Sequence, residues 1–390
     1  MSAAEVISLG CRLNIAESER IRSLVASEDV VVINSCAVTS EAVRQTRQAI
    51  RKARRARPDA RLLVTGCAAD IERDQLSAMP EVDGLVANET KLDARAWNVP
   101  EPAETALAKR TRAFIAVQNG CDHSCTFCVI PQGRGRSRSL TIPQVLRQVE
   151  RHLDQGAPEV VLTGVDVTSW GHDLPDASPL GELVRAVLDT FPQLQRLRMS
   201  SLDGIEIDPL LFDLFAGEER LMPHLHLSLQ HGHDLILKRM KRRHLRGDAL
   251  ELVARLKERR PELAIGADLI AGFPTESEEH HEANRSIIRE LGIVHGHIFP
   301  YSPRPGTPAA RMPQLDKPLI KSRAADLRAD VAKTREAWLQ SLVGKPLSIL
   351  TETSGTGYSP NFARVAVPAG TPKGMIVTVT PTALEKGLLT

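Results

Sequence analysis

The sequence predicts an α/β protein with three parts: an N-terminal Rossmann-like domain with a parallel sheet, a central partial (βα)6 barrel of the TIM type, and a small C-terminal part made of β-strands. Two observations lead to this prediction. Apolar runs alternate with helical patterns up to about residue 343, as expected around parallel sheets. From residue 344 onward, short runs of β-type residues are separated by Gly, Pro and Ser, which is typical of strands joined by tight turns.

The composition excludes several other classes of protein. Of the 390 residues, 42% are hydrophobic and 25% are charged, which is ordinary for a globular protein of two to three domains. No apolar run reaches the roughly 20 residues of a membrane helix, and the N-terminus lacks a secretory pattern. We therefore expect a cytoplasmic protein that makes no membrane contact. In that reducing compartment, the six cysteines point to metal binding or catalysis rather than disulfides.

The first domain, residues 1–97, is predicted from three strand–helix units. Strands are expected at 6–9, 30–33 and 62–64, and helices at 14–27 and at 40–57, the latter capped by Ser40. A cysteine follows each strand closely, namely Cys11, Cys36 and Cys67. Because ligands bind at the carboxyl ends of parallel strands, we expect these three cysteines to converge on one site.

The central domain, residues 113–343, follows a polar stretch at 98–112 that is predicted to be a linker. Strands are expected at 114–117, 160–162, 197–199, 225–229, 264–270 and 294–299, and helices at 143–153, 180–188, 276–291 and 319–342. Six such units suit a complete or incomplete barrel, with an open doubly wound sheet as the alternative. The tail, 344–390, has strands predicted at 347–350, 363–367 and 375–379. It is so short that we expect it to pack on the larger domain.

A second cysteine group lies on one short loop after the first strand of the central domain. Cys121, Cys125 and Cys128 have the spacing Cys-x3-Cys-x2-Cys. Three thiolates can hold three irons of a 4Fe–4S cluster, which leaves the fourth iron open, as in reactive metal centres. The alternative is a structural zinc ion with His123 or a distant histidine as the fourth ligand, but zinc sites prefer paired Cys-x2-Cys motifs.

This spacing, with Phe127 before the third cysteine, resembles that of the radical S-adenosylmethionine (SAM) superfamily. The segments 9–14, 34–39 and 65–68 resemble the N-terminal domain of its methylthiotransferases. The resemblance implies two 4Fe–4S clusters, SAM as a cofactor, and a catalytic role for Cys121, Cys125 and Cys128. Cys11, Cys36 and Cys67 are implied to hold the second, sulfur-carrying cluster. The residues implied to contact SAM are Phe127, Gly164, Asp166, Ser228, Gln230 and Asp268.

Residues 36–39 and 224–230 look most like one branch of this family, which methylthiolates N6-threonylcarbamoyladenosine next to the tRNA anticodon. Other branches act on isopentenyladenosine in tRNA or on a ribosomal-protein aspartate. The resemblance implies three partners: the tRNA anticodon stem-loop, an electron donor such as flavodoxin or ferredoxin, and a sulfur donor. The tail resembles a shortened TRAM domain, which implies a small C-terminal β-barrel that binds RNA. An iron–sulfur electron-transfer protein without SAM chemistry and a zinc-stabilised RNA-binding protein are the alternatives from other classes.

The net charge of +2 conceals three basic segments. Residues 43–58 hold seven basic residues and no acidic one, residues 238–246 hold six, and Arg134, Arg136 and Arg138 follow the cysteine loop. Such segments suit phosphate contacts with RNA, and a solvated basic face is the alternative reading. Residues 224–233 contain four histidines, which are expected to line the barrel or its loops rather than to bind a metal: His224, His226, His231 and His233.

Overall fold

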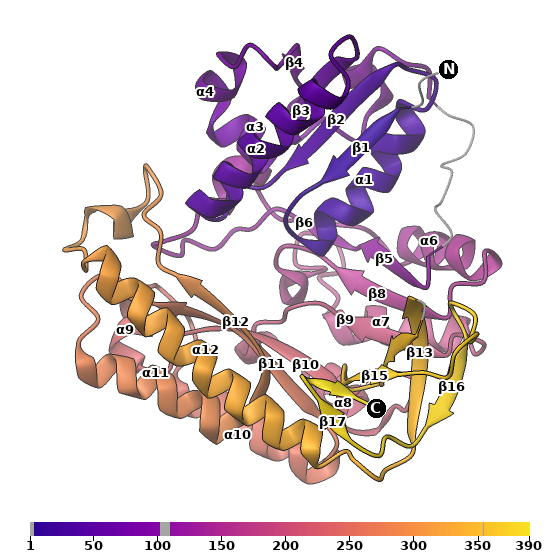
Figure 1. Ribbon diagram of the computed structural model, residues 1–390, viewed down its shortest axis with the longest axis vertical. Helices are drawn as coiled ribbons and strands as arrows, with labels where there is room; N and C mark the ends of the chain where they lie inside the picture. The colour runs from indigo at the N-terminus through magenta and orange to yellow at the C-terminus, as the bar shows by residue number, and fades with distance from the viewer. Residues whose placement is uncertain (1–3, 102–109, 354) are drawn as a thin grey trace.

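The computed structural model describes residues 4–101, 110–353 and 355–390 of the chain. The N-terminal part is a parallel sheet in the order β1 (Glu5–Ser8), β2 (Val30–Ser35), β3 (Arg61–Gly66) and β4 (Gly84–Leu85) (Figure 1). Alternate residues of β2 belong to two different apolar clusters, one with α1 (Arg12–Leu24) and one with α2 (Ser40–Ala56). The sheet is therefore covered on both faces, which explains why β2 is a continuous apolar run.

Helix α2 is capped by Thr39 and not by the predicted Ser40. The Thr39 side-chain oxygen accepts a hydrogen bond from the N–H of Ala42 at 3.1 Å, while Ser40 is already the first helical residue. Both residues are good capping types, so the sequence alone could not decide between them. Short helices α3 (Cys67–Ile71) and α4 (Arg73–Ser77) follow β3, and a 3-10 helix, η1 (Ala94–Trp97), ends this part.

The central part is the predicted partial barrel, built from two three-stranded parallel sheets. One sheet contains β5 (Arg112–Ala116), β8 (Glu159–Thr163) and β9 (Arg196–Met199). The other contains β10 (His224–Gln230), β11 (Ala264–Ala271) and β12 (Ile293–Pro300). Isolated bridges connect the two sheets between β9 and β10. Within the described residues, β5 and β12 do not pair, so the barrel is open on that side.

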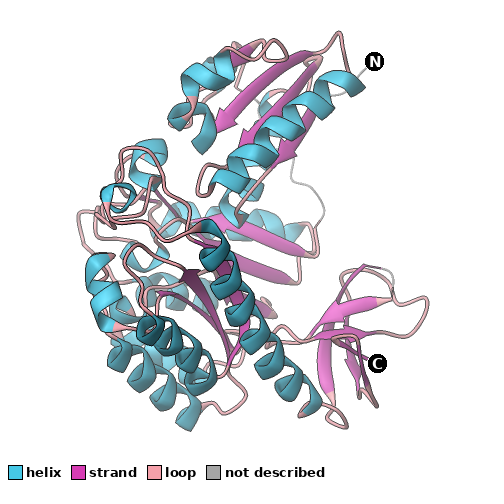
Figure 2. Ribbon diagram, turned by 60° about the vertical axis from the view of Figure 1, so that its left-hand side comes forward, coloured by secondary structure: helices cyan, strands magenta, loops and turns pink. Residues whose placement is uncertain are grey.

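Helices cover the outer face of this barrel (Figure 2). They are α6 (Ile142–Asp154), α7 (Leu180–Thr190), α8 (Pro209–Gly217), α9 (Asp234–Arg239), α10 (Arg246–Arg259), α11 (Glu278–Leu291) and α12 (Lys317–Gln340). Helix α11 starts two residues later than predicted because Ser277 caps it, accepting from the N–H of His280 at 3.3 Å. Within the described residues, no helix is long and apolar enough to cross a membrane.

The predicted linker, 98–112, lies largely outside the described residues, since 102–109 are not among them, and Arg112 already belongs to β5. The tail forms one six-stranded sheet instead of the three predicted strands. Its strands are β13 (Leu347–Thr353), β14 (Thr356–Tyr358), β15 (Arg364–Ala366), β16 (Ile376–Val379), β17 (Leu384–Glu385) and β18 (Leu388–Leu389). Among the described residues the outer strands β16 and β17 are not paired, so the sheet does not close into the expected barrel.

The tail packs against the barrel at the amino ends of its strands, as its small size led us to expect. Arg196 Nη2 donates to the Ser348 carbonyl at 2.9 Å, and Arg198 Nη1 donates to the Pro360 carbonyl at 2.9 Å. The ring of Phe362 lies under the Arg198 guanidinium, 3.8 Å from its centroid to Cζ. The tail therefore covers the end of the barrel at which the barrel strands begin. The N-terminal part lies toward the other end, where the barrel strands finish (Figure 1).

Candidate active site

The first cysteine triad gathers at the carboxyl edge of the N-terminal sheet. Cys11 lies at the start of α1, Cys36 follows β2 directly, and Cys67 follows β3 directly. Gly10 lets the Cys11 loop approach, since a Cβ there would lie 2.6 Å from the Cβ of Cys36. Burial raises the pKa of Cys36 to about 11, and the neighbouring Cys67 and Cys11 act in the same direction against the N–H of Val38.

The second triad lies on the loop between β6 (Gln118–Asn119) and α5 (Ile130–Arg134). Two backbone N–H groups donate to its sulfurs at 3.4 Å, that of His123 to Cys121 and that of Ile130 to Cys128. Burial is the main cause that raises the pKa of Cys121 to about 12 and that of Cys128 to about 11. Clustered, half-buried thiols with N–H donors aimed at sulfur fit a bound metal cluster, because a cation relieves the repulsion among thiolates.

The two triads are neighbours, although 54 residues separate Cys67 from Cys121. Helix α5, which begins two residues after Cys128, packs on α3 at Cys67: a Cβ on Gly133 would lie 3.4 Å from the Cα and Cβ of Cys67. Asn88 bridges the two segments, since its Nδ2 donates to the Gly133 carbonyl and lies 3.9 Å from the Cys67 sulfur. The structure therefore brings all six predicted cysteines to one region between the two domains.

A buried ionic network fixes this contact. Arg134 Nη1 lies 2.9 Å from Glu17 Oε1, and Lys91 Nζ lies 2.6 Å from Glu17 Oε2. Burial favours a raised pKa for Glu17, but Lys91 and Arg134 outweigh it and lower the pKa. The prediction that Arg134 contacts phosphate is wrong, because its side chain is 2% exposed and already paired.

Asp166, a predicted SAM-contacting residue, lies beside the second triad. Its Oδ2 is 3.8 Å from the Cys121 sulfur and 2.7 Å from His123 Nε2. Hydrogen bonding to Asp166 and Glu206 raises the pKa of His123 to about 10, against the guanidinium of Arg243 nearby. The ligand atoms of Cys121, His123 and Asp166 all lie within 4.8 Å of one another, so the geometry leaves the zinc alternative at His123 open.

Three further predicted residues lie on elements around the same loop. Gly164 follows β8 and packs on β6, where a Cβ would lie 2.7 Å from the Gln118 carbonyl. The Ser228 carbonyl accepts from Arg242 Nη2 at 2.8 Å, and Nη1 of the same arginine lies 3.8 Å from the Cys125 sulfur. Phe127 packs edge-on against Phe273, with ring centroids 6.5 Å apart.

The remaining two, Gln230 and Asp268, lie on the neighbouring strands β10 and β11. Gln230 ends β10 in a left-handed conformation, with φ of 68°. Asp268 Oδ1 lies 3.1 Å from both His226 Nε2 and His297 Nδ1, inside the barrel. Asp268 is 42 residues from His226 in the chain, and the pairing of β10 with β11 brings the two side chains together. The donor atoms of these three side chains all lie within 4.8 Å of one another.

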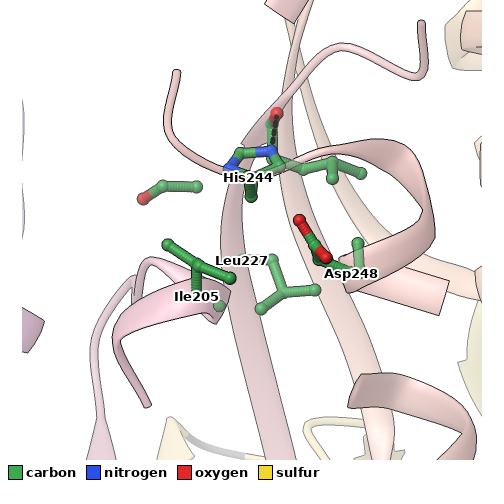
Figure 3. A pocket seen from close by; sticks show the side chains of 8 residues that line it. Ile205, Leu227, His244 and Asp248 are labelled. Atoms are coloured by element: carbon green, nitrogen blue, oxygen red, sulfur yellow. Dashed lines mark hydrogen bonds between the residues drawn. The ribbon is translucent and has the colours of Figure 1, made fainter. Parts of the chain in front are cut away.

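A small pocket lies beside Ser228, between β10, the 3-10 helix η3 (Gly204–Glu206) and the start of α10 (Figure 3). Figure 3 labels four of its lining residues: Ile205, Leu227, His244 and Asp248. His244 is held by the Leu229 carbonyl at 3.1 Å. None of the six cysteines lines this pocket, so it is separate from the cysteine region.

Most of the basic segments are neutralised by local ion pairs. On α2, Arg44 pairs with Glu41 and Arg54 with Asp83, and in the second segment Arg242 pairs with Asp203. Within the three basic segments, all of whose residues the structure describes, four exposed cations have no ion pair: Lys52, Arg55, Lys238 and Lys241. Phosphate binding by these segments stays a prediction that rests on fewer free charges than the sequence suggested.

Comparison with known proteins identifies the families to which the parts of this chain are similar. Residues 115–286 match the model of the Radical SAM superfamily, and residues 3–87 match that of the uncharacterized protein family UPF0004. The radical SAM methyltransferase TsrM from Kitasatospora setae shares the fold, with a TM-score of 0.54 and 17% identity over 72% of this chain and 64% of that chain. The barrel is thus a radical SAM domain.

Curated relatives align over nearly the whole chain. The threonylcarbamoyladenosine tRNA methylthiotransferase MtaB of Rickettsia prowazekii is 43% identical over 99% of this chain and 96% of its own length. The tRNA-2-methylthio-N(6)-dimethylallyladenosine synthase of Paracoccus denitrificans is 30% identical over 89% of this chain and 85% of its own. The chain belongs to the radical SAM methylthiotransferase family, whose radical SAM domain implies a 4Fe–4S cluster and SAM.

Proposed function

We propose that the protein converts N6-threonylcarbamoyladenosine next to the tRNA anticodon to its 2-methylthio derivative. The observation that carries this proposal is the meeting of two cysteine triads from two domains, with Gly133 of the radical SAM domain against Cys67 of the first. A methylthio transfer needs both a radical source and a sulfur source at one adenine carbon. The identity to a relative named for this reaction supports the choice of substrate.

In this proposal Cys121, Cys125 and Cys128 hold the radical SAM cluster, and Cys11, Cys36 and Cys67 hold a second 4Fe–4S cluster. When bound, these groups and SAM supply the radical and the methylthio sulfur. The chain itself contributes hydrogen bonds to sulfur: the N–H groups of His123 and Ile130 stabilise the negative charge on the sulfurs of Cys121 and Cys128. Arg242, 3.8 Å from the Cys125 sulfur, adds a positive charge.

The proposed SAM-binding residues are Phe127, Gly164, Asp166, Ser228, Gln230 and Asp268. Asp166 contacts His123, which lies on the cysteine loop. The Ser228 carbonyl accepts from Arg242, which also approaches the Cys125 sulfur. These contacts beside the second triad support the role of Asp166 and Ser228 best. Asp268 is engaged by two histidines deeper in the barrel, which suits contact with the far end of a bound ligand.

The proposed macromolecular partner is the tRNA anticodon stem-loop, met in the cytosol. The exposed cations Lys52, Arg55, Lys238 and Lys241 are the candidates for phosphate contacts. Two further partners follow from the chemistry: an electron donor such as flavodoxin or ferredoxin, and a sulfur donor that restores the second cluster.

The test is nucleoside mass spectrometry of tRNA from cells with and without this gene, the latter complemented with wild type, Cys36→Ala or Cys125→Ala. We expect 2-methylthio-N6-threonylcarbamoyladenosine to disappear on deletion and to return only with wild type. Loss of the 2-methylthio form of dimethylallyladenosine instead would move the protein to the other tRNA branch. An unchanged nucleoside profile, in a cell without a second such enzyme, would contradict the proposal.

A further inference from the structure

Arg12 links the first cysteine triad to the interior of the barrel. It follows Cys11 directly and is the first residue of α1, the helix that packs beside β5 at the open side of the barrel (Figure 1). Its Cζ lies 5.8 Å from the ring centroid of Phe362, which also contacts Arg112 and Arg198. One side chain therefore extends from the residue next to Cys11 to the charged residues inside the barrel.

The other charged side chains around Arg12 are already paired. Glu159 accepts from Arg112 and from Arg198, and Arg112 also lies 2.5 Å from Glu352. Asp268 accepts from its two histidines. Glu159 and Asp268 attract Arg12 only at longer range, and no carboxylate of the described residues lies within ion-pair distance of its guanidinium.

Arg12 therefore has no anionic partner of its own in these surroundings. The guanidinium groups of Arg12, Arg112 and Arg198 all lie against the ring of Phe362, so the charge of Arg12 lies in unfavourable surroundings. The Nη2 atom of Arg112 is buried and has no hydrogen-bond partner. A cation that is partly buried among other cations gains most from an anionic ligand that brings its own oxygen atoms. Arg12 is only partly buried, so a ligand can reach it.

The substrates of the two tRNA branches differ in the group that such a cation would recognise. A threonylcarbamoyl substituent on N6 of adenine ends in a carboxylate, whereas a dimethylallyl substituent is purely apolar. Adenine C2 and C6 both flank N1, so an adenine whose C2 faces the first triad carries its N6 substituent close to the residues around Cys11. Arg12 is the cation next to Cys11 in the chain, whereas Arg134 and Lys91, which also lie near this triad, are already paired with Glu17.

We infer that Arg12 binds the carboxylate of the threonylcarbamoyl group and thereby selects this substrate over the dimethylallyl one, an inference that rests on the proposed function. Arginine suits this task because its planar guanidinium can donate two parallel hydrogen bonds to one carboxylate. Arg12 is thus a specificity-determining residue, separate from the cysteine ligands.

The test uses the full-length, anaerobically reconstituted protein and two anticodon stem-loops that differ only at the carboxyl group: one carries threonylcarbamoyladenosine and the other its methyl ester. Methylthiolated product and the dissociation constant are measured for wild type, Arg12→Met, Arg12→Lys and the control Arg22→Met. Arg22 lies on the same helix and its guanidinium approaches the Val6 carbonyl at 3.5 Å. Iron content and the thermal midpoint verify that each variant is folded.

We expect Arg12→Met to weaken binding of the acid by roughly tenfold or more and to leave the ester unchanged. Arg12→Lys should keep part of the preference because it retains a point charge, and Arg22→Met should match wild type on both RNAs. The inference is overturned if Arg12→Met lowers acid and ester equally, or if the acid-to-ester ratio stays that of wild type. Wild-type activity on the acid RNA reports separately on the proposed function.

Discussion

Glu17 and Arg134 form a buried ion pair between the two domains, with Oε1 and Nη1 2.9 Å apart and side chains that are 1% and 2% exposed. Glu17 lies on α1, six residues after Cys11, and Arg134 ends α5, six residues after Cys128. Lys91 binds the same carboxylate at 2.6 Å. The pair therefore fixes the distance between the elements that carry the two cysteine triads.

Breaking this pair should destabilise the protein strongly. Replacing one partner leaves a buried charge without compensation, so Arg134→Met and Glu17→Gln should each cost about 3–5 kcal/mol, measured by urea unfolding. The control is Arg44→Met, which removes an exposed pair with Glu41 and should leave stability nearly unchanged, because solvent screens exposed pairs. If the buried and the exposed variants cost the same, the pair does not hold the domains together.

Gly120 should be required for the geometry of the second triad. Its φ is +77°, and a Cβ there would lie 1.9 Å from the Arg136 carbonyl oxygen. Gly120→Ala should therefore displace the loop that begins at Cys121 and lower the iron bound after reconstitution.

Gly156 provides the matched control, since its φ is +78° but nothing lies within 4 Å of its added Cβ. Gly156→Ala should cost only about 1–2 kcal/mol for the left-handed backbone and leave iron content unchanged. Equal iron content in Gly120→Ala and Gly156→Ala would show that the close approach to Arg136 does not matter for the cluster.

Stability should fall in mild acid because of a buried histidine on α6. Burial, with Arg151 and Arg110, lowers the pKa of His152 from 6.5 to about 4. The unfolded chain then takes up a proton below pH 6.5 that the folded chain refuses until about pH 4. Stability is fully present above pH 6.5 and is lost by about 1.4 kcal/mol per pH unit between these two values.

His152→Leu should remove this part of the pH dependence. The variant should gain stability over wild type as the pH falls from 7 to 5, in urea unfolding at each pH, whereas the exposed His172 replaced by Leu should leave the slope unchanged. Parallel pH curves for wild type and His152→Leu would contradict the assignment of this slope to His152.

The sequence predicted the features that are encoded locally. A continuous apolar run such as Val30–Ile33 requires cover on both faces, and the cysteine after each strand then falls at one sheet edge. The triad Cys121, Cys125 and Cys128 is contained in eight residues, so its spacing is readable without a fold. The same holds for the six barrel strands, each of which has its own apolar segment.

What the sequence could not predict depends on pairing between distant segments. Arg134 reads as a surface cation in a basic stretch, and only the fold reveals Glu17, 117 residues away, as its partner. His226 meets Asp268 because β10 and β11 are neighbours. The strands β14, β17 and β18 have only two or three residues each, which is too short for a period-two pattern to be recognised.

The most direct test of the central claim, two clusters held by two triads, is the iron content of anaerobically reconstituted protein. Wild type should bind about eight irons per chain, and Cys36→Ala and Cys125→Ala about four each, as expected for one 4Fe–4S cluster per triad. The double variant should bind almost none. A wild-type value that saturates near about four irons and is unaffected by Cys36→Ala would contradict the two-cluster account.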